Sequence, residues 1–388
     1  MPKKAIIIGA GIGGLSTAIA IQKKGWNVSV FDRTSSLTEA GAGIVLAANA
    51  MKALVKLGVA KDVVSIGAAV GKAEIRTWNG ELILDLPTSR QAKRYGSQSF
   101  LIHRGKLQSI LLEKVEEASI VKLNKQLASV EQNNDKVIAT FTDGSKEEGD
   151  ILIGADGLHS IVREQLFGTL QTRYSGYTAL RGICSFKDER YTMEQGGGFE
   201  AWGPGKRFGF SQLGQGQVFW FAAINAPRGE TISSNDRKQV ALNHFNRWFE
   251  PIQTVIAATV DGDILHHDIV DYEPLPYWSK GRITLLGDAA HPMLPNLGQG
   301  GAQAMEDALV LARCLAEPHI NVNLPSSLQE YEKIRKQRTT KIVQQSRRMG
   351  RMVQLENQLA ITVRNSLLRH VPNKILIERL NWIVGHKV

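Results

Sequence analysis

Cysteine is scarce in this chain of 388 residues, where Cys184 and Cys314 are the two that occur. Two cysteines cannot build the disulfide framework of a small secreted domain or a zinc site made of several thiolates. Long hydrophobic runs are also missing, because apolar stretches such as residues 5–8 and 151–153 are far too short to cross a bilayer. The first residues do not have the pattern of a cleavable secretory signal. We therefore expect a cytoplasmic protein.

Acidic residues are outnumbered by basic ones, 37 against 47, which leaves a formal net charge of +10 at pH 7. Much of the excess lies in residues 330–388, where acids are few. Such a tail can attract nucleic acid, anionic lipid or a small anion, but the same pattern is typical of a solvated helix face. We favour the solvated face and expect no nucleic-acid partner, while membrane association stays an open alternative.

The overall composition is that of a globular protein, with 43% hydrophobic and 22% charged residues. These values exclude a disordered or fibrous chain. The length indicates two domains, or one domain with a large insertion.

A β-α-β unit with a glycine-rich turn opens the chain. Residues 3–8 form an apolar segment typical of buried parallel strands, and the stretch GAGIGG follows at residues 9–14. A helical segment and a second strand come next, and that strand ends at Asp32. Glycines permit a tight turn and close approach of a pyrophosphate, and an acid in this place can accept both ribose hydroxyls. Together these features predict a dinucleotide site, although they do not separate FAD from NAD.

The sequence pattern changes twice after this unit. Residues 171–270 contain alternating and aromatic strand segments separated by glycine-rich turns, the pattern of an antiparallel sheet. Parallel-strand character returns at residues 282–287, and helical segments continue to the end. We therefore expect a discontinuous nucleotide-binding domain at 1–170 and 271–320. Residues 70–100 can contribute to the substrate domain that interrupts it. The insert at 171–270 forms the substrate domain, and residues 321–388 form C-terminal helices.

Two later motifs place an acid after a buried strand. Residues 149–163 read GDILIGADGLHSIVR, and residues 281–292 read GRITLLGDAAHP. The second motif is followed by PNLGQGG at residues 295–301 and by a helix that carries Glu306 and Asp307. A glycine-rich backbone that leads into a helix presents N–H donors and a positive dipole end to an anionic group.

In this order, the three glycine–acid features resemble those of the group A flavoprotein aromatic hydroxylases. These single-component monooxygenases use FAD and NAD(P)H and include salicylate hydroxylase and the p-hydroxybenzoate hydroxylase fold. The resemblance extends from Lys3 to about Leu315. It implies an α/β fold in which a Rossmann-like FAD-binding domain is interrupted by an antiparallel-sheet substrate domain and followed by C-terminal helices. It also implies bound FAD and a transient hydride donor, NADH or NADPH, which agrees with the lack of a second GxGxxG motif.

The resemblance implies FAD-binding roles for residues of each motif. Asp32 would hold the adenosine ribose and Asp288 the ribityl chain, while Asp156 would lie near both FAD and the passing nicotinamide cofactor. Residues 41–44, Gly41-Ala42-Gly43-Ile44, resemble the segment beside the flavin ring that moves in this family. The implied cofactor-binding set is Gly9, Gly11, Ile12, Gly13, Gly14, Asp32, Arg33, Gly43, Ile44, Arg104, Leu127, Asp156, Asp288, Pro295, Gly298, Gln299, Gly300, Gly301 and Ala302.

Candidate substrate residues come from the antiparallel insert and from the loop at 295–301. Aromatic and apolar walls with one or two polar anchors suit a small aromatic ligand, and Arg207 can pair with an acidic or enolised substrate. The candidates are Arg207, Phe210, Gln212, Phe219, Phe221, Pro295 and Asn296. Urate-oxidising relatives carry an acid where this chain has Asn296, which argues against urate. For each aromatic residue, a place in the sheet core is an equally good interpretation.

Three histidines invite a catalytic or metal-binding interpretation. His291 follows Asp288 in a string that the resembling family uses to build the flavin loop, so we favour a structural role. His266 and His267 are adjacent in a predicted strand and point to opposite faces, so we expect no metal site. Neither a Gly-x-Ser-x-Gly elbow nor a Walker loop occurs.

The resemblance implies a monooxygenase that hydroxylates a small aromatic or heteroaromatic compound with O2 through a C4a-(hydro)peroxyflavin. One alternative is an epoxidase or hydroxylase of a lipophilic quinone or isoprenoid-type substrate. A second is a flavin-binding regulatory protein without turnover. No catalytic side chain is assigned, and the chain is expected to be a monomer or homodimer.

Overall fold

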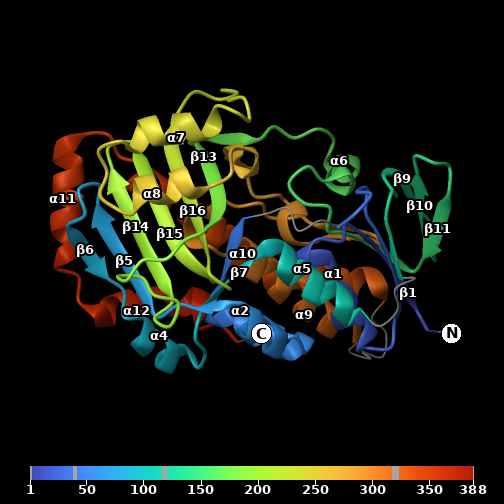
Figure 1. Cartoon of the computed structure of the whole chain (residues 1–388). Coiled ribbons are helices and arrows are strands. Elements are labelled where there is room, and N and C mark those ends of the chain that lie inside the picture. The colour runs from blue at the N-terminus through green and yellow to red at the C-terminus, as the bar shows by residue number, and fades with distance from the viewer. Residues whose placement is uncertain (1, 38–41, 116–119, 317–322, 388) are drawn as a thin grey trace.

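The computed structural model describes residues 2–37, 42–115, 120–316 and 323–387. Figure 1 shows two sheets at opposite ends of the molecule, with helices α1 (Ile12–Gln22), α5 (Arg104–Lys114) and α9 (Gly300–Ala316) lying between them and beside the sheet that contains β1. We expect the functional site in the region between the two sheets, because strands of one sheet end there and side chains of the other point toward it.

The first sheet has six strands in the order β18-β19-β12-β1-β2-β8. Its pairs are parallel except for β18 with β19. The central strands are buried on both faces, as expected for a parallel sheet covered by helices. The strands are β1 (Lys4–Ile8), β2 (Asn27–Phe31), β8 (Val121–Lys122), β12 (Ile151–Gly154), β18 (Ser279–Lys280) and β19 (Ile283–Leu285). Because β19 pairs with β12, the layer that begins at β1 is completed after the insert.

The second sheet has seven strands in the order β17-β13-β16-β15-β14-β5-β6. It is antiparallel apart from β14 and β5, which run parallel and join the segment near residue 75 to the insert. The strands are β5 (Lys72–Thr77), β6 (Leu82–Asp85), β13 (Arg173–Ser185), β14 (Gly197–Gly203), β15 (Lys206–Gly214), β16 (Gln217–Asn225) and β17 (Leu265–Asp271). Helices α7 (Arg237–Phe245) and α8 (Ile252–Ala258) pack against one of its faces, where Phe208, Trp220 and Phe245 form a buried aromatic core.

Two small sheets complete the fold, of which the first contacts β15 of the seven-stranded sheet and the second contacts β1 and β12 of the six-stranded sheet. One has the order β3-β7-β4, with β3 (Gly43–Leu46), β4 (Ala68–Ala69) and β7 (Phe100–His103). Strand β7 pairs with β3 and β4, whereas β8 joins the six-stranded sheet beside β2. The other sheet has the order β11-β10-β9, with β9 (Leu127–Gln132), β10 (Val137–Phe141) and β11 (Lys146–Gly149).

The remaining helices cover the edges of the two layers. They are α2 (Ala48–Leu57), α3 (Ala60–Ile66), α4 (Thr88–Tyr95), α6 (Ile161–Phe167), α10 (Leu324–Val353), α11 (Gln358–Arg369) and α12 (Asn373–Val384). The long helix α10 packs along α9, whereas α11 lies beside β6 of the seven-stranded sheet and α12 contacts α4 and α2. Within the described residues, no helix is both long and apolar enough to cross a membrane.

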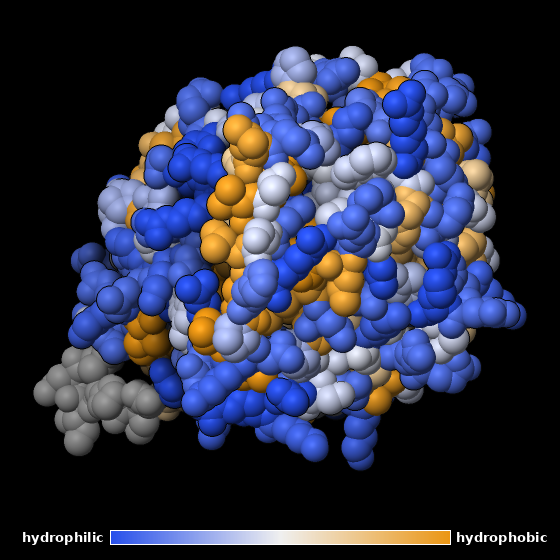
Figure 2. Space-filling view, turned by 90° about the vertical axis from the view of Figure 1, so that its left-hand side faces the viewer, coloured by the Kyte–Doolittle hydropathy of each residue, from blue (hydrophilic) through white to orange (hydrophobic). Residues whose placement is uncertain are grey.

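Helix α11 presents hydrophobic side chains to solvent. Leu359, Val363 and Leu367 are 78%, 58% and 67% exposed and follow one another at intervals of four residues, so they share one face of the helix. Figure 2 shows hydrophobic residues gathered in a band on the side of the molecule where α11 lies.

Candidate functional site

The glycine loop between β1 and α1 is tightly packed at Gly9 and Gly14 and has free space at Gly11. A Cβ atom on Gly9 would overlap the carbonyl oxygen of Ala155, and one on Gly14 would overlap that of Gly9. Gly9 also has φ +106°, which favours glycine. A Cβ on Gly11, by contrast, would meet no atom within 4 Å. Two of the glycines are thus required by the fold itself, while Gly11 leaves free space beside the N-terminus of α1.

Asp32 ties the end of β2 to this loop. Its Oδ2 accepts a hydrogen bond of 2.7 Å from the Ala10 amide, and its Oδ1 accepts bonds from the amide and hydroxyl of Thr34 at 2.9 and 2.8 Å. Gln108 on α5 donates to the Ala10 carbonyl oxygen at 2.8 Å. The carboxylate is half-buried, so it can brace the loop and still reach a ribose, and the neighbouring Arg33 is exposed.

Asp156 carries an unsatisfied oxygen at the end of β12. Its Oδ2 accepts from the amides of Ile161 and Val162 at 2.8 and 3.2 Å, so one oxygen caps α6. Its Oδ1 is buried without a hydrogen-bond partner among the described residues. Burial raises the pKa of Asp156, although the Ser160 hydroxyl and the backbone amides act in the opposite direction. An orphaned acceptor in this place needs a donor from outside the protein chain.

Asp288 lies in a short 3-10 turn, η3 (Gly287–Ala289), directly after β19. Its side chain is accessible to solvent but is surrounded closely by protein atoms, and this desolvation raises its pKa, against the lowering effect of His291 and Arg104. A Cβ atom on Gly300 would lie 3.8 Å from Asp288 Oδ1. The carboxylate therefore faces the first turn of α9.

The loop before α9 faces β3. Gly298 has the left-handed φ of +59° after the 3-10 turn η4 (Pro295–Leu297), and α9 begins at Gly300. A Cβ on Gly301 would lie 2.8 Å from Ile44 Cδ1, so the start of α9 touches β3. Pro295 is exposed, and Ala302 is buried. Gly43 and Ile44 lie on β3 as described, whereas Gly41 lies outside the described residues.

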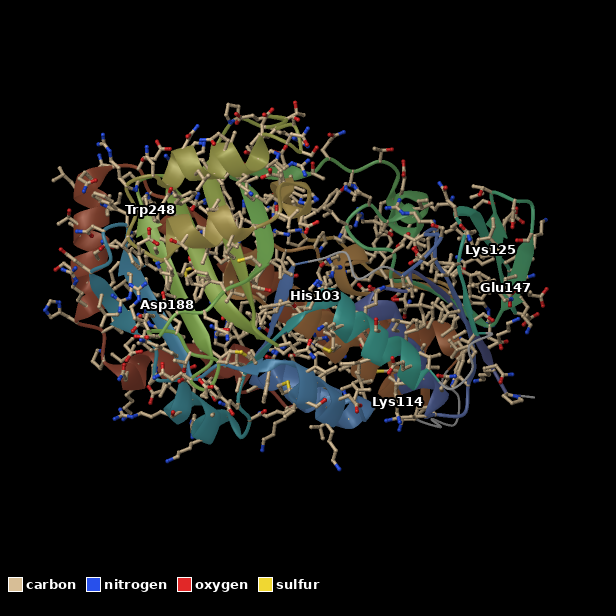
Figure 3. The ribbon with its side chains drawn as sticks, viewed as in Figure 1. His103, Lys114, Lys125, Glu147, Asp188 and Trp248 are labelled. Carbon is tan, nitrogen blue, oxygen red and sulfur yellow. The ribbon has the colours of Figure 1, made fainter. Side chains whose placement is uncertain are left out.

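Two predicted cofactor residues lie further along this region. Arg104 is exposed at the start of α5, its amide bonds the Ala42 carbonyl oxygen at 3.1 Å, and its charge acts on Asp288. The preceding His103 caps α5 by accepting from the Gly105 amide and lies between the two layers in Figure 3. Leu127 is 3% exposed in the core cluster of the first layer.

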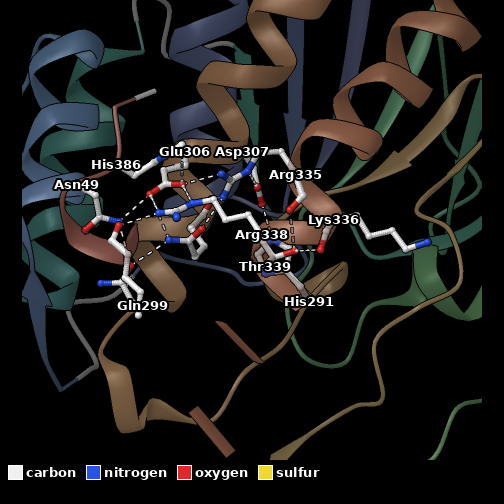
Figure 4. Close-up of polar contacts among 12 residues, drawn as sticks. Asn49, His291, Gln299, Glu306, Asp307, Arg335, Lys336, Arg338, Thr339 and His386 are labelled. Atoms are coloured by element: carbon white, nitrogen blue, oxygen red, sulfur yellow. Dashed lines mark hydrogen bonds and ion pairs between the residues drawn. The ribbon is translucent and has the colours of Figure 1, made fainter. Parts of the chain in front are cut away.

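A buried polar network supports the loop from beneath (Figure 4). The side chain of Gln299, a predicted FAD-binding residue, belongs to this network, because its Oε1 accepts from Asn49 and Gln303 at 2.9 and 3.0 Å. Glu306 pairs with Arg335 and Arg338 at 2.6 and 2.8 Å.

Asp307 connects this network to the turn that carries Asp288. It pairs with Arg335 and with His291 at 2.6 Å each, and its Oδ2 also accepts from the Gly287 amide at 3.1 Å. Although burial opposes ionisation, His291 and Arg335 lower the pKa of Asp307 to about 2. His291 is therefore engaged in holding the turn, which fits the structural role that the sequence indicated.

Arg335 and Arg338 are functional residues that the sequence interpretation missed. The basic tail was expected to form a solvated helix face, but Arg335 is buried and pairs with two acids of α9. The signal in the sequence was the adjacent pair Glu306-Asp307 on a predominantly apolar helix, since buried carboxylates need counter-charges.

The face of the seven-stranded sheet that is turned toward the loops carries Arg207, Phe219 and Phe221. The Arg207 guanidinium lies 5.6 and 5.5 Å from the ring centroids of Tyr177 and Phe221. It donates to Glu200 at 3.2 Å and to Asn296 Oδ1, which also accepts from Tyr177 at 3.0 Å. Asn296 is thus brought to Arg207 as expected, but its carbonyl oxygen is already engaged by two donors.

The structure separates the remaining pocket candidates. Phe210 packs with Phe199 and Tyr191 in the aromatic core at 5.4 Å, and Gln212 donates to the Tyr191 carbonyl oxygen. Both are buried on the face covered by α7 and α8, because alternate residues of β15 point to opposite faces and Arg207 points to the other one. The expectation that Phe210 and Gln212 line the pocket is therefore corrected.

Phe219 and Phe221 stay in the candidate site. Both are half-buried, their ring centroids lie 6.3 Å apart, and a Cβ on Gly43 would lie 2.7 Å from the Phe219 ring. The aromatic wall of the sheet thus meets β3, which in turn touches the start of α9.

Comparison with known proteins agrees with this geometry. The FAD binding domain family matches residues 3–346. An aurachin C monooxygenase/isomerase from Stigmatella aurantiaca is 40% identical over 367 residues, 94% of this chain and 93% of the relative. A 6-hydroxynicotinate 3-monooxygenase from Pseudomonas fluorescens is 32% identical over 343 residues, 87% of this chain and 88% of the relative. The crystal structure of Klebsiella pneumoniae HpxO complexed with FAD and uric acid has a TM-score of 0.92 and 29% identity, with 98% of this chain and 96% of that chain covered.

These matches confirm the resemblance, the fold class and the cofactor that the motifs indicated, since the relatives are monooxygenases of similar length and the HpxO structure contains FAD. The chain belongs to the FAD binding domain family and is an FAD-dependent monooxygenase.

Proposed function

We propose that the protein hydroxylates a small aromatic or heteroaromatic compound bound between the seven-stranded sheet and the start of α9, with NADH or NADPH as the hydride donor. The observation that carries the proposal is the contact of the half-buried Phe219 ring with Gly43 on β3, the strand that also touches the start of α9, with the half-buried Phe221 ring 6.3 Å from that of Phe219. Relatives are named for 6-hydroxynicotinate and for a complex with uric acid, both of which are heteroaromatic.

The residues present fit FAD. Gly11 leaves open space at the N-terminus of α1, and Asp156 Oδ1 is a buried acceptor without a partner among the described residues. We assign the pyrophosphate to Gly11, Ile12 and Gly13, the adenosine to Asp32, Arg33 and Leu127, and the ribityl chain to Arg104, Asp156 and Asp288. The flavin ring would lie beside Gly43, Ile44, Pro295, Gly298, Gly300, Gly301 and Ala302, whereas Gln299 acts through the network beneath. Bound FAD would supply hydride acceptance from NAD(P)H and the activation of O2.

The protein side chains have two tasks in this reaction. Phe219 and Phe221 provide an apolar wall that holds an aromatic ring and keeps water away from it. The amides of Gly300 and Gly301 lie at the positive end of the 17-residue helix α9. They would stabilise negative charge on a flavin ring bound beside them. Arg207 is fixed by Glu200 and Asn296 and so shapes the pocket between Tyr177 and Phe221.

The cellular setting follows from less direct observations. Cys184 and Cys314 are buried and neither forms a disulfide bond, which supports a reducing compartment such as the cytoplasm. We propose a monomer or homodimer without a nucleic-acid partner.

The test is oxidation of NADH and NADPH by the purified yellow protein in air, with and without a panel of phenolic acids, hydroxypyridines and anilines. We expect one class to stimulate oxidation and to yield a hydroxylated product. Measuring hydrogen peroxide in parallel separates hydroxylation from uncoupled oxidation. Full flavin content without stimulation by any aromatic compound would contradict the proposal and favour first a lipophilic substrate and then a non-catalytic flavoprotein.

A second candidate is a monooxygenase of a lipophilic quinone or isoprenoid-type substrate. The exposed band of Leu359, Val363 and Leu367 on α11 favours it, because such a stripe near basic residues suits the surface of an anionic membrane. Vesicles that contain menaquinone provide the discriminating probe: stimulation by these vesicles, and not by the soluble panel, would replace the first proposal by the second.

A further inference from the structure

Arg181 occupies an unusual position for an arginine in this fold. Of the arginines that the structure describes and that are not exposed, every other one donates a hydrogen bond or forms an ion pair, whereas Arg181 does neither with any described residue. A guanidinium carries five donors and remains charged at neutral pH. Holding it half-buried without a partner costs free energy, which the fold must offset elsewhere.

The strand register puts Arg181 in the proposed pocket. It lies on β13 directly opposite Phe221 on β16 and Leu265 on β17. Directly opposed residues of antiparallel strands project from the same face, so Arg181 shares the face of Phe221 and Arg207 and points away from the aromatic core. The next residue, Gly182, faces that core, since a Cβ there would touch the Trp220 ring.

The surroundings of Arg181 are cationic. Burial and the charge of Arg104 lower the pKa of Arg181, and Tyr177 acts in the opposite direction. Burial and, after it, the charge of Arg181 lower the pKa of His267 on β17. Arg207, which was the anion anchor expected from the sequence, is already paired with Glu200 and Asn296. The free guanidinium on this face is therefore a different residue from the one that the sequence indicated.

We propose that Arg181 binds the anionic group, a carboxylate or an ionised ring oxygen, of an aromatic substrate whose ring lies against Phe219 and Phe221. This inference rests on the proposed function and names the substrate class of the same site. A planar guanidinium can pair with a carboxylate through two parallel hydrogen bonds, which fixes the orientation of the ring as well as its position. Arg181 is thus a specificity-determining residue for the reaction.

Equilibrium binding to the FAD-loaded protein tests this directly, with the change in flavin absorbance as the readout. The probes are pairs of an acid and its amide: 4-hydroxybenzoate with 4-hydroxybenzamide, salicylate with salicylamide, and 6-hydroxynicotinate with 6-hydroxynicotinamide. We expect at least one acid to bind more tightly than its amide. Arg181→Met should weaken that acid by about 10- to 100-fold, the range for one charged hydrogen-bonding partner, and leave the amide unchanged. Arg181→Lys should retain part of the preference, and Arg247→Met, at an exposed arginine, should retain all of it.

Thermal stability gives a second readout that does not depend on turnover. Because the guanidinium has no described partner, Arg181→Met without ligand should melt at the same temperature as the parent protein or higher. The preferred acid should then raise the melting temperature of the parent and not that of the variant.

Three results would overturn the inference. The first is failure of every acid to bind more tightly than its amide, and the second is a melting temperature that falls in Arg181→Met. The third is a raised KM for NADH or NADPH in this variant with unchanged acid binding, which would assign the guanidinium to the coenzyme pyrophosphate. A protein that hydroxylates neutral aromatic compounds without any preference for acids would retain the proposed function and refute this inference alone.

Discussion

Arg335 is the residue whose replacement tests the buried network most severely. Its side chain is 1% exposed, and the two carboxylates that it pairs with, on Glu306 and Asp307, are 0% exposed. Replacing it with Met leaves Asp307 with the His291 side chain as its remaining partner in the network, whereas Glu306 keeps Arg338. Breaking one side of a buried ion pair typically costs about 3–5 kcal/mol, because the remaining charge stays in a low-dielectric environment. That is a large share of the ~5–15 kcal/mol that stabilises a typical domain.

Urea denaturation of the FAD-loaded protein measures this loss, and tryptophan fluorescence offers a local reporter. Trp278 lies 5.2 Å from the His291 ring and 5.9 Å from Tyr331, so its emission responds to the network. We also expect weaker FAD retention, because Asp307 holds the Gly287 amide beside Asp288. Arg351→Met on the same helix is the matched control, since Arg351 is exposed.

Neutralising the partners separates a charge effect from a packing effect. Combining Arg335→Met with Glu306→Gln and Asp307→Asn removes the uncompensated charges and should recover much of the lost stability. A loss below about 1 kcal/mol in the single variant, the value typical of exposed pairs, would refute the reasoning. The reasoning would also be refuted if the triple variant, after the separate costs of Glu306→Gln and Asp307→Asn are subtracted, were as unstable as Arg335→Met alone.

Four further predictions concern the loop, the two sheet faces, the pH dependence and the cofactor. Gly14→Ala should abolish or severely weaken folding because its Cβ meets the Gly9 carbonyl, whereas Gly11→Ala should keep the melting temperature of the apoprotein and weaken FAD binding; equal effects on both would contradict the division of roles. Phe210→Leu should lower the free energy of unfolding by about 1 kcal/mol and leave the substrate KM unchanged, whereas Phe221→Leu should raise that KM. The reverse pattern would show that the two residues are assigned to the wrong faces of the seven-stranded sheet. The pKa of Asp307 is lowered to about 2, so its ionisation stabilises the fold fully above pH ~4, and this contribution of about 2 kcal/mol is lost as the pH falls toward 2. If the free energy of unfolding of Asp307→Asn fell equally steeply between pH ~4 and ~2, the role given to Asp307 would be contradicted. Asp288→Ala should lower flavin content after gel filtration with little change in apoprotein melting, and a variant that copurifies with full flavin would refute the role of that carboxylate.

The first layer of the fold was predictable because its signals are local. The apolar segment, the glycine loop, the helix and the terminal Asp32 occur in one continuous stretch, and the structure shows β1, α1 and β2 at nearly the expected residues. The return of the chain to this layer after the insert was also visible, since β19 carries the apolar character of a buried parallel strand. The limits of the domains themselves stay a prediction.

The pocket was less predictable because it depends on which face each strand residue takes. Phe210 and Arg207 lie on the same strand at odd spacing, so alternation alone separates them once the direction of one is known. The sequence does not reveal which face is covered by α7 and α8, and aromatic residues suit both a core and a ligand wall. Arg181 was missed for a related reason, because a missing partner is visible in a structure and not in a sequence.

The network beneath the loop joins residues that are distant along the chain. Asn49 and Arg335 both donate to Glu306, and Gln299 joins them through Asn49, because α2 and α10 each pack against α9. Composition showed that the tail is basic, but the choice between a solvated and a buried arginine depends on helix packing that no local pattern encodes.

Incorporation of oxygen from labelled O2 tests the central claim most directly. The FAD-loaded protein is incubated with NADH or NADPH and the aromatic panel under 18O2, and the products are analysed by mass spectrometry. The account predicts a hydroxylated aromatic product that carries one 18O atom, formed at a rate that falls with the flavin content of Asp288→Ala. A product labelled from water instead, or hydrogen peroxide as the sole oxygen product with every compound of the panel, would contradict it.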